Sequence, residues 1–165
     1  SDIYERILEH LQGRGIHFVV DATKELLVKS LPYGPFLIKP NNYELGEIFG
    51  VRLTTRSSVI PYAKKLQNMG ARNVLVSMAG EGAVLVSDDG QVIDAPAPEG
   101  KLINGVGAGD SMVAGFMAGY LARHDYNHAF CMGVASGSAS AFSENLATKE
   151  EIEKVYKTIV LEEKV

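Results

Sequence analysis

Short runs rich in β-branched and aromatic residues alternate with helical periodicity through the first 95 residues of this chain. Apolar residues recur at helical spacing from Ile3 to Leu11, and a strand-like run, His17–Val20, follows two glycines. The same alternation predicts helices over about 24–31, from 41, and over 57–69, and strands at 36–39, 74–76, 82–87 and 91–93. We therefore predict an α/β fold with a mainly parallel sheet, helices on its faces and one antiparallel hairpin.

The last third of the chain is predicted to be helical, with helices that begin near Gly109, Asn127 and Thr148. The longest stretch without a charged residue runs from Tyr126 to Ser143 and contains an asparagine, a histidine and four serines. This stretch is too polar to span a bilayer, so we predict a buried helix and no membrane partner.

Composition narrows the class of protein further. The chain has 165 residues, enough for one domain with a single core that needs neither a disulfide nor a structural metal. Its net charge of −4, without blocks of like charge, argues against a nucleic-acid partner. The single cysteine, Cys131, indicates a reducing, cytoplasmic setting. Because the N-terminus has neither a starting methionine nor a secretion signal, we expect the chain to be a piece of something longer.

A glycine-rich loop before the first of the late helices is a candidate phosphate site. Gly107, Ala108, Gly109 and Asp110 stand immediately before a run of small and apolar residues. Glycines allow close approach to a ligand, and the first amides of a helix have no internal partners, so a phosphate fits there. An acid beside a bound phosphate suggests a general base for an incoming hydroxyl. The alternative is that Asp110 only caps the helix.

An acidic loop and a second glycine loop also follow predicted strands. Asn41-x-x-Glu44 opens a helix, and a single glutamate could bind Mg²⁺ together with water and phosphate oxygens. The alternative is a capping box, the same spacing that Thr148 and Glu151 show at the last helix. The second loop, Ser77–Gly82, could place its backbone along a nucleotide or could be an ordinary connection between strands.

Two other groups are interpreted as structural. His124 and His128 have a spacing compatible with a metal pair, but the residues between them indicate a turn between helices, which favours surface histidines. Cys131 has no activating base near it in sequence, so we predict a small core residue.

Three motifs, in this order, resemble the ribokinase-like (PfkB) carbohydrate kinases: Lys39-Pro40-Asn41-x-x-Glu44-Leu45, Ser77-x-x-x-x-Gly82 and Gly107–Phe116. The last is the most specific, and the resemblance extends over essentially the whole chain. It implies a doubly wound, ribokinase-like α/β fold with helices on both faces of the sheet, and the use of ATP and Mg²⁺. It also implies that residues 1–165 are the C-terminal nucleotide-binding and catalytic part of the kinase domain, because family members are nearly twice as long and the N-terminal half is absent.

The resemblance assigns roles to the motif residues. It implies Asp110 as the catalytic base and the backbone of Gly107, Ala108 and Gly109 as the anion hole. It implies Asn41 near the phosphates and Glu44 near Mg²⁺. Along the nucleotide it implies the following residues: Ser77, Gly80, Glu81 and Gly82.

Within the family the chain is most similar to the hexose-phosphate branch, on the same motifs and on the run Ser143–Thr148. This implies transfer of the ATP γ-phosphoryl group to a primary hydroxyl of a ketose phosphate, with fructose 1-phosphate as the first candidate acceptor and tagatose 6-phosphate as the second. Two departures matter. Asn104-Gly105 stand where many relatives carry Asp-Thr, whose acid helps hold a monovalent cation, and Ala79 stands where glycine is usual.

Other functions stay open at this point. A nucleotide- or sugar-phosphate-sensing module without turnover would keep the same loops. A dinucleotide-dependent oxidoreductase would need a glycine where Asp110 stands. If the N-terminal strands are absent, a bare sheet or helix surface could support a homodimer, and we expect the chain alone to be inactive.

Overall fold

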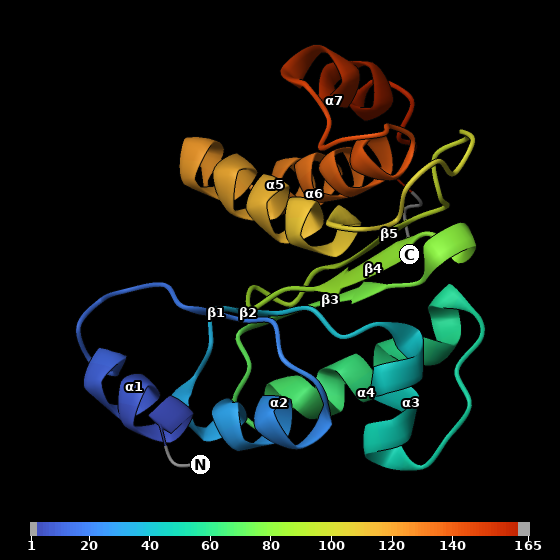
Figure 1. Cartoon of the computed structure of the whole chain (residues 1–165). Coiled ribbons are helices and arrows are strands. Elements are labelled where there is room, and N and C mark those ends of the chain that lie inside the picture. The colour runs from blue at the N-terminus through green and yellow to red at the C-terminus, as the bar shows by residue number, and fades with distance from the viewer. Residues whose placement is uncertain (1–2, 162–165) are drawn as a thin grey trace. The chain divides into compact units, whose positions relative to one another are not determined.

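A computed structural model describes residues 3–161 (Figure 1). The helices are α1 (Ile3–Leu11), α2 (Lys24–Ser30), α3 (Asn42–Phe49), α4 (Arg56–Asn68), α5 (Ala108–Arg123), α6 (Tyr126–Ala141) and α7 (Lys149–Tyr156), with short 3₁₀ turns η1 (Leu31–Tyr33) and η2 (Ala79–Glu81). The strands are β1 (Val19–Val20), β2 (Leu37–Ile38), β3 (Asn73–Ser77), β4 (Ala83–Val86) and β5 (Val92–Ala95). Each predicted helix and strand is present, with bounds shifted by a few residues.

The strands follow one another in the sheet in chain order, β1-β2-β3-β4-β5. β1 pairs with β2 in parallel, with Val19 opposite Leu37, and β2 pairs with β3 in parallel, with Leu37 opposite Asn73. Five residues connect β3 to β4, and another five connect β4 to β5. Because a parallel crossover needs a dozen or more residues, these two connections require antiparallel pairing. The parallel part and the hairpin are therefore confirmed, within a mixed sheet.

The chain forms two compact units. The first comprises residues 1–78 and 84–92, and the second comprises residues 79–83 and 93–165. Each unit has its own buried apolar residues, so each is described by itself.

The core of the first unit lies between the helices α2–α4 and the strands. Leu27, Leu45, Val59 and Leu66 from the helices, and Val74 from β3, are all fully buried. Their periodic spacing along the helices is the signal from which the helices were predicted. A buried polar contact supports the same unit, because Asn73 Nδ2 donates to Phe36 O at 2.8 Å.

The second unit is built on the contact between α5 and α6. Glycines let the two helices approach: a Cβ on Gly115 would lie 2.5 Å from Met132 O, and one on Gly133 would lie 3.0 Å from Met112 O. Eleven of the sixteen residues of α6 are buried, which confirms the buried helix predicted from its uncharged stretch. None of the helices formed within residues 3–161 combines the length and apolar character that a membrane span requires.

Candidate active site

In the first unit, the carboxyl ends of β2 and β3 bring two of the predicted site residues together. Asn41 forms an isolated parallel bridge with Ser77, and Ser77 N donates to Pro40 O at 3.2 Å. Carboxyl ends of parallel strands share one edge of a sheet, and ligands bind at this edge in folds of this class.

Asn41 and Glu44 form a complete capping box at the start of α3. Asn41 Oδ1 accepts a hydrogen bond from Glu44 N at 2.8 Å, and Glu44 Oε2 accepts one from Asn41 N at 2.8 Å. The capping alternative is therefore confirmed for both residues. Glu44 is half-buried, and its second carboxylate oxygen, Oε1, has no hydrogen-bond partner among residues 3–161. One carboxylate oxygen thus stays available to a ligand.

A nearly buried cation at the same edge was missed by the sequence reasoning. The side chain of Lys39, directly after β2, is 11% exposed, and its Nζ lies 3.6 Å from Asp21 Oδ1 at the end of β1. Lysine is rarely buried unless paired, so a lysine this close to an apolar strand is a signal that could have been used. A positive group at the edge that carries Asn41 and Ser77 suits a phosphate.

The second glycine loop begins in one unit and continues in the other: Ser77 belongs to the first, and Gly80, Glu81 and Gly82 to the second. Ala79, at the position where glycine was expected, has a φ of +47°. That conformation is unfavourable for a residue with a Cβ. Gly82 has a φ of +103°, and a Cβ there would lie 2.8 Å from Ala97 N, so glycine is required at this position.

In the second unit, the glycine-rich loop leads into α5 without a side-chain cap. Gly107 is the N-cap, with a φ of +79° that favours glycine. Ala108 N donates to Gly105 O at a long 3.3 Å. The amides of Gly107, Gly109 and Asp110 donate to no group among the described residues. Three donors at the positive end of a sixteen-residue helix therefore stay available to an anion.

Asp110 is the third residue of α5, not its cap, so the capping alternative for this residue is wrong. Its side chain is exposed. Within residues 3–161 the carboxylate makes neither a hydrogen bond nor an ion pair.

Hydrogen bonds from the end of α6 hold the start of α5 and the loop before it. Ser140, buried in α6, donates through Oγ to Ser111 Oγ at 3.0 Å, and its Oγ accepts from Ala147 N at 3.2 Å. Ala141 O accepts from two backbone amides of the loop that leads to Gly107. The turn that carries Asp110 is therefore held by α6 as well as by α5.

The groups interpreted as structural have structural surroundings. The His124 ring lies edge-on to Tyr120, with centroids 5.2 Å apart, and His128 Nδ1 is 2.9 Å from Tyr156 Oη. Asp125 caps α6 between them, as the predicted interhelical turn requires. Burial raises the pKa of the Cys131 thiol to about 11, which confirms a core cysteine.

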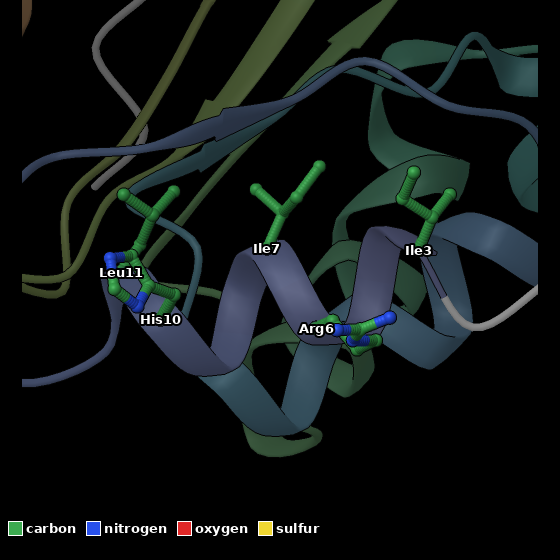
Figure 2. A pocket seen from close by; sticks show the side chains of 5 residues that line it. All are labelled: Ile3, Arg6, Ile7, His10 and Leu11. Carbon is green, nitrogen blue, oxygen red and sulfur yellow. The ribbon is translucent and has the colours of Figure 1, made fainter.

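Two surface hollows in the first unit lie away from the predicted site residues. One, of about 460 Å³, runs along α1 and is lined by Ile3, Arg6, Ile7, His10 and Leu11. Figure 2 shows Ile3, Ile7 and Leu11 projecting from one side of the helix. The other, of about 600 Å³, lies between α2 and α3. Both are open depressions, and neither contains a motif residue.

Among the described residues, no cluster of three or more His, Cys, Asp or Glu could hold a metal by itself. A protein cage of this kind suits zinc or calcium, whereas Mg²⁺ keeps several waters and takes oxygens from substrate phosphates. A single free carboxylate oxygen, as on Glu44, fits Mg²⁺.

A comparison of the chain with known protein families agrees with the features of this site. These features are the glycine N-cap of α5, the free carboxylate of Asp110 and the order of the motifs. The chain belongs to the pfkB family carbohydrate kinases, whose family model matches residues 2–153. It is similar to 1-phosphofructokinase of Bacillus subtilis, at 47% identity over 93% of this chain and 50% of that protein. It is also similar to D-tagatose-1-phosphate kinase of Bacillus licheniformis, at 30% identity over 93% of this chain and 51% of that protein.

Solved structures agree on the fold. A Staphylococcus aureus protein superposes with a TM-score of 0.92 at 41% identity, over 98% of this chain and 53% of that one. Arabidopsis thaliana ribokinase, solved with ribose and ATP, superposes with a TM-score of 0.81 at 18% identity, over 94% of this chain and 52% of that one. The predicted ribokinase-like α/β class is confirmed. The chain spans about half the length of the curated relatives it matches.

Proposed function

We propose that this chain is the nucleotide-binding and catalytic part of an ATP-dependent kinase that acts on a ketohexose phosphate. The first candidate acceptor is fructose 1-phosphate, which would give fructose 1,6-bisphosphate. The 47% identity with a 1-phosphofructokinase supports this choice. Because the chain spans about half of that relative, we propose that the residues that read the sugar lie in the part that this chain does not span.

The observation that carries the proposal is the free carboxylate of Asp110 beside amides that have no partner among residues 3–161. In the proposed reaction, the sugar hydroxyl gives its proton to the Asp110 carboxylate as its oxygen attacks the γ-phosphorus of ATP. The bond between that phosphorus and the β–γ bridging oxygen breaks, and ADP leaves. The amides of Gly107, Gly109 and Asp110 stabilise the charge on the transferring group, with Ala108 completing the turn.

The first unit supplies the proposed nucleotide contacts. Lys39 suits a phosphate because it is a nearly buried cation with one carboxylate, Asp21, 3.6 Å away. Asn41 and Ser77 present backbone and side-chain polar groups at the same edge of the sheet. Glu44 would hold Mg²⁺ through Oε1, directly or through water. When bound, Mg²⁺ would neutralise charge on the phosphate oxygens.

Gly80, Glu81 and Gly82, in the second unit, are also proposed as nucleotide contacts. Gly80 and Glu81 are exposed in η2, where a ligand can approach the backbone. Gly82 is buried and sets the direction of the chain as it enters β4. A cytoplasmic location and a homodimer stay predictions.

A substrate panel on the full-length kinase tests the proposal. Release of ADP would be followed in a coupled assay with fructose 1-phosphate, tagatose 1-phosphate, tagatose 6-phosphate and fructose 6-phosphate. We expect the highest kcat/KM with fructose 1-phosphate. The tagatose phosphates are included because of the 30% identity with a D-tagatose-1-phosphate kinase.

The same panel separates the kinase from a sensing module. Calorimetry with ATP and Mg²⁺ would measure nucleotide binding in parallel. Binding of nucleotide without ADP release from any of the four sugar phosphates would overturn the kinase proposal and select the module without turnover. Binding of NAD in place of ATP would select an oxidoreductase.

A further inference from the structure

Two large aliphatic side chains are exposed beside Gly107, the N-cap of α5. Val106, directly before Gly107, is 82% exposed, the largest value among the large apolar side chains of the described chain. Leu146, on the connection between α6 and α7, is 67% exposed. It nevertheless lies against the loop, because a Cβ on Gly107 would be 3.0 Å from Leu146 Cδ2. Both residues belong to the second unit.

Hydrogen bonds of Asn104 hold the segments of these two residues together. Asn104 Oδ1 accepts from Val106 N at 3.0 Å, and Asn104 Nδ2 donates to Glu144 O at 3.2 Å, two positions before Leu146. The orientation of the amide follows from its partners, because a backbone N–H can only donate and a carbonyl can only accept. The two aliphatic residues are therefore carried on segments that are fastened to each other beside the start of α5.

The groups next to these side chains are polar and free. The amides of Gly107, Gly109 and Asp110 donate to no group among the described residues, and the Asp110 carboxylate has no hydrogen bond there. Single exposed aliphatic residues are common on protein surfaces. The observation that requires an explanation is that two of them border the same cluster of free donors and acid.

A free carboxylate at the site of phosphoryl transfer can also activate water. If water gave its proton to Asp110 and attacked the γ-phosphorus of ATP, the bond to the β–γ bridging oxygen would break. ADP and inorganic phosphate would then leave without a sugar product. An ordered water in a protein makes about three hydrogen bonds, and an aliphatic side chain offers none. The neighbours of Asp110 therefore influence whether a water can be held there.

We propose that Val106 and Leu146 form an apolar border that denies water a hydrogen-bonded position beside the transferring phosphoryl group. A sugar phosphate is oriented by its own contacts with the protein, whereas a water depends on polar partners close to Asp110. The border thus favours a sugar hydroxyl over water as the acceptor. This inference rests on the proposed function, because it concerns how the same site selects its acceptor.

The test measures ATP hydrolysis by the full-length kinase without any sugar. Val106→Thr keeps the shape of the side chain and adds a hydroxyl, and Leu146→Asn keeps a similar size and adds an amide. Val160→Thr and Leu121→Asn are the matched controls, because these side chains are 70% and 58% exposed in the same unit. Val160 follows α7, and Leu121 lies near the far end of α5. Phosphate release, the KM for ATP and the unfolding temperature are measured for each.

We expect Val106→Thr and Leu146→Asn each to raise phosphate release by about three- to ten-fold, the effect of one added hydrogen bond to the attacking water. The double variant should exceed either, and with fructose 1-phosphate present it should release more ADP than it forms bisphosphate. Unfolding temperatures should stay near that of wild type, because both side chains are exposed. The two controls should hydrolyse ATP at the wild-type rate. Addition of Asp110→Asn to the double variant should remove the gain.

Four results would overturn the proposal. These are wild-type hydrolysis in the double variant, an equal rise in the controls, a rise that persists with Asp110→Asn, and a higher KM for ATP without extra hydrolysis. The last would make the two side chains nucleotide contacts. If Leu146→Asn fails to fold, Val106→Thr alone decides.

The same measurements separate this inference from the proposed function. If the variants gain no hydrolysis while wild type phosphorylates a sugar phosphate, the border fails and the kinase proposal stands. If wild type phosphorylates none of the four sugar phosphates, the kinase proposal fails. Phosphate release by the variants, with and without Asp110→Asn, then still decides whether the border excludes water.

Discussion

The helices α3 and α5 begin in opposite ways, although each has an acidic residue at its third position. At α3 the N-cap is Asn41, and Glu44 exchanges two hydrogen bonds of 2.8 Å with it. At α5 the N-cap is Gly107, which has no side chain to offer, and Asp110 makes no bond within the described chain. Hydrogen bonds within its own helix start explain why α3 has Glu44, whereas no hydrogen bond of the described chain involves the Asp110 carboxylate.

α7 makes the contrast sharper. Its Thr148 and Glu151 form the same capping box as α3, with Thr148 N donating to Glu151 Oε2 at 2.7 Å. No predicted site residue belongs to α7. A glutamate three positions after an N-cap residue is therefore evidence for the start of a helix. This spacing alone does not indicate a metal site.

The largest effect is expected from removing the free carboxylate. Asp110→Asn in the full-length kinase should lower kcat by roughly 10²–10⁴-fold, the usual contribution of a general base. The unfolding temperature should change little, because the carboxylate has no partner among residues 3–161. Steady-state kinetics and thermal unfolding on one preparation check both parts. If Asp110→Asn kept wild-type activity, the free carboxylate of α5 would have no catalytic role. Its difference from the hydrogen-bonded Glu44 of α3 would then have no functional meaning.

The next effect is expected from the glycine cap. Gly107→Ala should cost about 1–2 kcal/mol, because alanine is strained at a φ of +79°, and should lower kcat/KM by about ten-fold as the free amides shift. Gly90→Ala is the control, since Gly90 has a φ of +88° in an exposed turn with open space around it. It should lose similar stability with unchanged kcat/KM. Equal losses of kcat/KM in both variants would mean that strain alone is responsible.

A smaller effect separates the two capping glutamates. Glu44→Gln and Glu151→Gln both keep a side-chain acceptor for the N-cap amide, so each should cost less than about 1 kcal/mol of stability. If Glu44 Oε1 serves Mg²⁺, only Glu44→Gln should raise the Mg²⁺ concentration for half-maximal activity, by about ten-fold. A titration of activity with Mg²⁺ checks this. An identical Mg²⁺ requirement in both variants would leave Glu44 with its capping role alone.

The smallest effect concerns Ala79. Ala79→Gly should stabilise the protein by roughly 0.5 kcal/mol, because relief of a φ of +47° outweighs the greater freedom of glycine in the unfolded chain. Ala118→Gly, at an exposed position in α5, should instead destabilise by about 1 kcal/mol. Denaturant unfolding of the two variants measures the difference. A destabilised Ala79→Gly would mean that the loop gains more from the alanine than its backbone angle costs.

The sequence was sufficient for those parts of the fold that repeat with a period. Helical spacing predicted α1, and the early alternation predicted α2 to α4 and the strands, because burial of one face leaves a regular trace in the residue order. The buried helix α6 was predicted from its uncharged stretch instead. Asn41, Glu44 and Ser77 could be assigned to segments that follow predicted strands, and Asn41 and Ser77 do form a bridge there.

The remainder depends on contacts between residues far apart in the chain. The ion pair of Lys39 with Asp21, eighteen positions apart, has no periodic trace. The bond from Asn104 Nδ2 to Glu144 O spans forty positions, and nothing in the sequence indicates that these two residues meet. The N-cap of α5 was also beyond prediction, because Asp110 and Gly107 are both residues that can begin a helix.

The burial of α6 on nearly every side also determines how the protein opens. Amide hydrogens exchange with deuterium only when a helix separates from its surroundings, and α6 has eleven buried residues with Ala129, Phe130 and Val134 among them. Its amides should be the last of the second unit to exchange, while those of the exposed, weakly packed α7 exchange early. Local opening at α7 would then expose the connection between α6 and α7, where Glu144 O accepts the bond from Asn104, well before α6 itself opens.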